Sequence, residues 1–131
     1  MQLKNKVAAV KEGAMKSASH NLYQTTVDAM MPRVGPVFAR VCDLAPSAIA
    51  NEAKYRSQVV EPAWLAVAAV TGGLASAIPD LHRRFDSALF YARAELLVVD
   101  TATERVTLVD DAMSRLPHVL LEGMRRPVPH A

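Results

Sequence analysis

The sequence predicts an all-α, single-domain bundle of about five helices with a long C-terminal helix. Prolines divide the 131-residue chain into segments, and apolar residues within most segments recur every three or four positions, which is the period of a helix with one buried face. A seven-residue apolar repeat then runs through the last third of the chain, as expected for a packed helix. We expect residues 1–124 to form the domain and 125–131 to be a loose C-terminal tail.

The first expected helix covers about residues 3–30, with one apolar stripe formed by Leu3, Val7, Val10, Ala14, Ala18 and Leu22. Pro32, Gly35 and Pro36 predict a turn after it, because proline disfavours a helix interior. A short helix over 37–44 is expected next. Pro46 then begins a helix that is expected to end near residue 60.

The segment from Pro62 to Pro79 contains no charged side chain and consists mostly of small residues. Pro62 is expected to begin this helix, and Gly72 and Gly73 to kink or divide it. Small residues repeat every four positions, which lets two helix backbones approach closely. The segment is therefore the buried central helix of a monomeric bundle, a subunit interface, or a membrane segment. The membrane interpretation is the weakest, since the run is at the short limit for a membrane span.

The last segment allows two interpretations. Phe85, Ala92, Val99, Val106 and Met113 recur every seven residues, and a continuous helix over 80–122 would be about 60 Å long. The alternative is an interruption or a β-hairpin at 96–109, where two β-branched runs flank a short polar stretch. The helix is favoured, because this stretch lacks the Gly, Asn and Pro that turns prefer and a lone hairpin is marginal in water.

The sequence predicts an interface built from the uncharged segment and extended by the seven-residue repeat. Its residues are Trp64, Leu65, Ala69, Val70, Gly72, Gly73, Leu74, Ala77, Phe85, Ala92, Val99, Val106 and Met113.

The histidines offer the main candidates for chemistry. His82 with Asp86, and His118 with Glu122, are each one helical turn apart, which could orient a base or hold a metal. No further residue completes either site, so solvated positions are expected for both pairs. Cys42 is the single cysteine, and we expect it to be a small buried residue. The sequence shows no nucleophile, phosphate-loop or metal motif, so it predicts no enzyme, no cofactor and no metal site.

The net charge of +2 is too small to indicate a nucleic-acid or membrane partner by itself. Residues 1–60 carry eight Lys and Arg against four acids, whereas 61–131 carry seven against nine. A basic surface is the candidate site for such partners, with the residues Lys4, Lys6, Lys11, Lys16, Arg83 and Arg84.

We therefore expect a non-enzymatic helical structural protein that self-associates or docks to a protein partner, as a scaffold, shell or coat-type subunit does. The alternatives are a membrane-surface or nucleic-acid-binding module that uses the N-terminal basic helix, and a small enzyme with a His/carboxylate site. A membrane partner is the least expected. The N-terminus has no uncharged hydrophobic segment of the secretory type, so a cytoplasmic location is expected.

Overall fold

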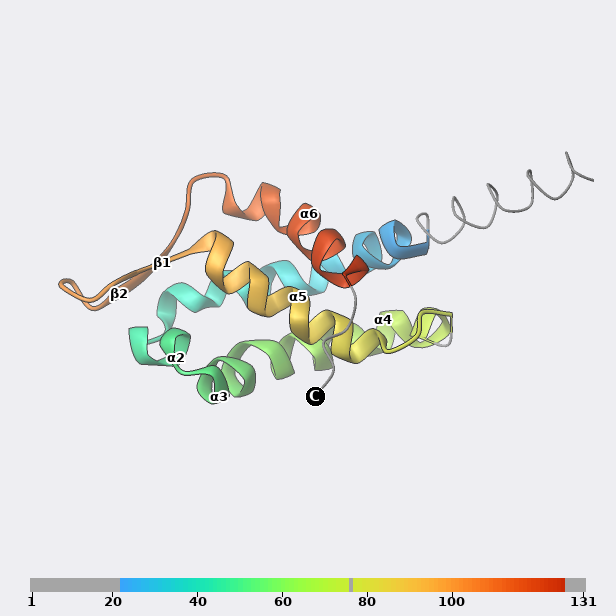
Figure 1. Cartoon of the computed structure of the whole chain (residues 1–131), viewed down its shortest axis with the longest axis horizontal. Helices are drawn as coiled ribbons and strands as arrows, with labels where there is room; N and C mark the ends of the chain where they lie inside the picture. Colours follow the sequence, from blue (N-terminus) through green and yellow to red (C-terminus); the bar gives the residue numbers. More distant parts are fainter. Residues whose placement is uncertain (1–21, 76, 127–131) are drawn as a thin grey trace, which may run out of the picture.

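The computed structural model of the chain describes residues 22–75 and 77–126, which form a mostly helical bundle (Figure 1). The all-α fold class predicted from the sequence is thus confirmed. In chain order the elements are a helix over 22–39, the 3₁₀-helix η1 (Arg40–Asp43), α2 (Pro46–Ala50), α3 (Glu52–Tyr55), the π-helical segment η2 (Arg56–Val60), α4 (Glu61–Ala75), α5 (Leu81–Leu96), the strands β1 (Leu97–Asp100) and β2 (Arg105–Leu108), and α6 (Ala112–Arg125).

The helix over 22–39 continues through Pro32 and Pro36, so the predicted turn at Pro32, Gly35 and Pro36 is wrong. An interior proline costs about 3 kcal/mol or more. Against this cost, four apolar side chains of the helix and one of η1 are fully buried along one stripe, and each contributes about 1.5–3 kcal/mol. Burial of the stripe therefore outweighs the two prolines. Its members are Val27, Met30, Val34, Phe38 and Val41.

Pro62 also lies inside a helical run, which extends from Glu52 to Ala75 and places Pro62 second in α4. The prediction that Pro62 begins a helix is therefore wrong. The wider π turn of η2 lies directly before it, where an ordinary α turn would press the proline ring against the carbonyl of residue 58. The helix expected from Pro46 to residue 60 is divided at Asn51, whose Oδ1 accepts a hydrogen bond from the Lys54 amide at 3.1 Å and caps α3.

The C-terminal half is two helices joined by a β-hairpin, so the alternative of a hairpin within 96–109 is confirmed and a continuous helix over 80–122 is wrong. The turn does not need Gly, Asn or Pro. Asp100 Oδ1 accepts hydrogen bonds from the amides of Ala102 and Thr103 at 3.0 and 3.2 Å, and Glu104 adopts φ 54°. The bonds from Thr103 and Ala102 hold the pKa of Asp100 below its usual range. Asp100, itself a common turn residue, thus forms the turn through its side chain without Gly, Asn or Pro.

Glu104→Gly is expected to raise the free energy of unfolding by about 0.5–1 kcal/mol. A left-handed conformation costs a non-glycine residue about 1–2 kcal/mol, and the greater entropy of glycine in the unfolded chain offsets part of that gain. Urea unfolding would measure the change. Ala102→Gly is the matched control, since it has no positive φ, and it should not stabilise the protein. Equal effects of the two substitutions would contradict the strain at Glu104.

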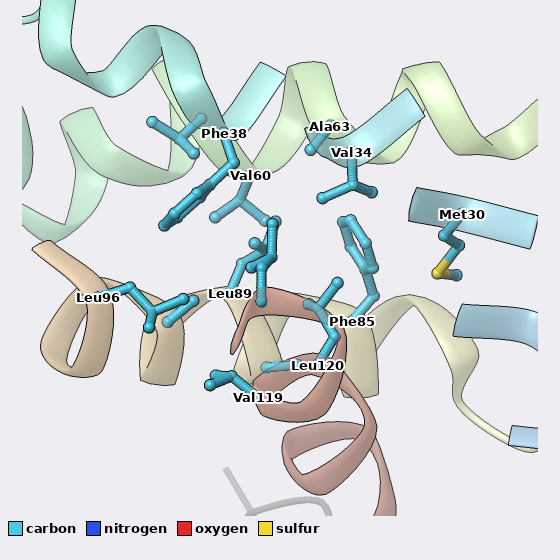
Figure 2. Close-up of a cluster of buried hydrophobic side chains, with 14 of the residues drawn as sticks. Met30, Val34, Phe38, Val60, Ala63, Phe85, Leu89, Leu96, Val119 and Leu120 are labelled. Carbon is cyan, nitrogen blue, oxygen red and sulfur yellow. The ribbon is translucent and has the colours of Figure 1, made fainter. Parts of the chain in front are cut away.

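The core lies between four parts of the chain. They are the helix over 22–39, the continuous run of η2 and α4, the helix α5 and the helix α6. Figure 2 shows Met30, Val34 and Phe38 directed toward side chains from these other helices. Helix α6 returns alongside α5 after the hairpin, and these two helices are in extensive contact (Figure 1). Gly123 allows this approach, because a Cβ there would lie 2.7 Å from the Cα of Ala88.

Packing of α5 on α6 also corrects part of the predicted interface. Phe85, Ala92 and Val106 are buried in the core of their own chain, so they are not surface contact residues. Val99 is partly buried against the same core. The seven-residue repeat reflects burial within one molecule because α5, the hairpin and α6 fold back on one another.

Two polar side chains tie the helices together. The buried Tyr55 hydroxyl donates a hydrogen bond to the Leu89 carbonyl at 2.7 Å, and burial raises the pKa of Tyr55. The Arg84 guanidinium donates to the carbonyls of Met124 and Arg126 at 2.9 and 3.1 Å, which satisfies the carboxyl end of α6. Arg84 of the predicted basic surface thus makes internal structural bonds.

Candidate functional site

Helix α4 is apolar on all sides, but only one side is covered by the rest of the described chain. Ala63, Val67 and Thr71 are buried at intervals of four residues. The Thr71 hydroxyl donates to the Val67 carbonyl at 3.0 Å, so its burial leaves no polar group without a partner. The interpretation of this segment as a buried central helix therefore holds for one side of α4 only.

The opposite side of α4 is exposed, and we call it the α4 outer face. It consists of Leu65, Ala68, Ala69, Gly72 and Gly73. Leu65 is 74% exposed, the highest value among the exposed large hydrophobic side chains of the described residues. A Cβ added at Gly72 or Gly73 would meet nothing within 4 Å. The face is thus shallow and uncharged, so another helix backbone could approach it closely.

Trp64 occupies the edge of this face. Its ring stacks on the His82 ring at 4.4 Å between centroids and 9° between planes, and it makes a tilted contact with Phe85 at 5.4 Å. Trp64 and Val70 are partly buried against the core. These two residues of the predicted interface therefore join α4 to the rest of the bundle, whereas Leu65 projects from it.

The remaining predicted interface residues fall outside this face or outside what the structure describes. Ala77 is exposed in the turn that precedes α5. Met113 lies on α6 and is 36% exposed. The side chain of Leu74 lies outside the described residues.

A polar groove runs beside α5. Its first part is a cavity of about 390 Å³ lined by Arg56, Val60, Glu61, His82, Arg83, Asp86 and Ser87. The Arg56 Nε and Nη2 donate to the two carboxylate oxygens of Asp86 at 3.0 and 3.1 Å, and this bond raises the pKa of Arg56. Arg56 therefore engages the carboxylate that could have oriented His82.

The second part of the groove is a cavity of about 420 Å³ that shares Arg56 and Asp86 with the first. The Arg56 guanidinium lies 4.5 Å from the centroid of the Phe90 ring. The Arg93 guanidinium lies 5.0 Å from the same centroid. Arg56 is thus held between the Phe90 ring and the Asp86 carboxylate, whereas Arg93 packs on the same ring and donates a hydrogen bond to the Ile49 carbonyl at 3.1 Å. The arrangement explains how η2 is fixed to α5.

The other candidates for chemistry lie apart from one another. His118 and Glu122 are 3.8 Å apart on an exposed side of α6, whereas His82 is on α5. Within residues 22–75 and 77–126, no three His, Cys, Asp or Glu side chains gather as a metal site would require. Over the same ranges, no helix is long and apolar enough to cross a membrane.

The structure also bears on the expectations for Cys42 and for the predicted basic surface. Cys42 is exposed in η1, so its predicted burial is wrong. The neighbouring Val41 completes the buried stripe, which turns the next side chain toward solvent. Of the predicted basic surface, Arg83 is exposed, and the residues Lys4, Lys6, Lys11 and Lys16 lie outside the described residues.

Two exposed apolar residues were not predicted. Tyr91 on α5 is 43% exposed. Val98 on β1 is 46% exposed, while its neighbours Leu97 and Val99 face the core. The alternation of strand side chains would have identified it, had the hairpin been favoured over the helix.

No family model, curated protein or solved structure matches the chain. The geometry of the chain itself is therefore what bears on its function.

Proposed function

We propose that this chain is a structural subunit that self-associates through the α4 outer face, in the manner of a scaffold, shell or coat protein. The observation that carries the proposal is a helix without charge beyond Glu61, its first residue, whose outer side the described residues leave open, with Leu65 74% exposed among alanines and glycines. Water tolerates such a surface poorly, and contiguous exposed apolar patches are typical of interaction sites.

The free energies of burial and association indicate that a partner must cover the whole α4 outer face, and not Leu65 alone. Burial of one leucine side chain contributes about 1.5–3 kcal/mol. Association costs about 4–15 kcal/mol in lost translational and rotational freedom. Leu65 alone cannot overcome this cost, so close backbone packing over Ala68, Ala69 and Gly72 must supply the rest.

Gly72→Leu is expected to abolish self-association while helix content stays unchanged. A Cβ at this position meets nothing within 4 Å, and the leucine side chain beyond it would hold a second helix away from the face. Light scattering across a concentration series measures the mass, and circular dichroism measures the helix content. Because the face is uncharged, assembly of the natural chain should persist at high salt.

Ala53→Leu is the matched control, since it adds an exposed leucine on α3, away from the α4 outer face. This variant should assemble as the natural chain does. A natural chain that stays monomeric at every concentration, or a Gly72→Leu variant with an unchanged mass, would overturn the proposal.

A further inference from the structure

We draw no further inference here: the strongest candidate, the polar groove beside α5, is lined by three arginines and three acidic residues and leaves no buried side-chain polar atom of the described residues without a partner, so nothing in the structure shows which class of ligand it would take.

Discussion

Phe85→Ala is expected to lower the free energy of unfolding by about 3–5 kcal/mol. The Phe85 ring is fully buried between helices, in contact with Trp64 and directed into the cluster of Figure 2. Its removal leaves a cavity that the packed helices cannot close. Because small domains are stable by only about 5–15 kcal/mol, this single change removes a large share. Urea unfolding measures the loss, which should not depend on protein concentration.

Leu65→Ala is the control for Phe85→Ala, measured at a concentration where the chain is monomeric. Its side chain is 74% exposed, so the free energy of unfolding should change by no more than about 0.5 kcal/mol. A Phe85→Ala variant with unaltered unfolding but altered assembly would instead restore Phe85 to the interface that the sequence predicted.

Gly123→Ala is expected to lower the free energy of unfolding by about 1–3 kcal/mol. The new Cβ would lie 2.7 Å from the Cα and 2.8 Å from the Cβ of Ala88. The Cα belongs to the backbone of α5, so the two helices must move apart. Alanine improves helix propensity by about 1 kcal/mol relative to glycine, but loss of the closest part of the α5–α6 contact exceeds this gain.

Gly72→Ala separates the clash from the change in propensity. It adds the same methyl group to a helical glycine where nothing lies within 4 Å, so it should stabilise the monomer by about 0.5–1 kcal/mol. Thermal unfolding of both variants gives the comparison. Changes of the same sign in the two variants would contradict the close approach at Gly123.

The turn predicted from Pro32 and Pro36 was wrong because the side chains around these prolines are strongly buried. The sequence places Pro32 and Pro36 in a turn because the cost of an interior proline is local and known. The free energy that compensates this cost comes from the burial of Val34 and Phe38, which flank Pro36. That burial depends on helices that lie far away in the sequence. A local rule could not weigh the two terms against each other.

The hairpin was an open alternative for a related reason. Its apolar residues fit both a seven-residue helical repeat and strand alternation, so periodicity alone could not separate them. The turn is made by the side chain of Asp100, a common turn residue, and by the left-handed conformation of Glu104, which no sequence rule for glutamate predicts. The exposed position of Val98 became visible only with the register.

The sequence by itself determined the helical class and located the uncharged segment, because helical period and charge are properties of neighbouring residues. Only the tertiary structure decided which side of α4 is covered. A helix that is apolar all round has no preferred buried face until other helices pack against it. Packing covered the side of Ala63, Val67 and Thr71 and left Leu65 and Gly72 open. The same packing placed Phe85 in the core.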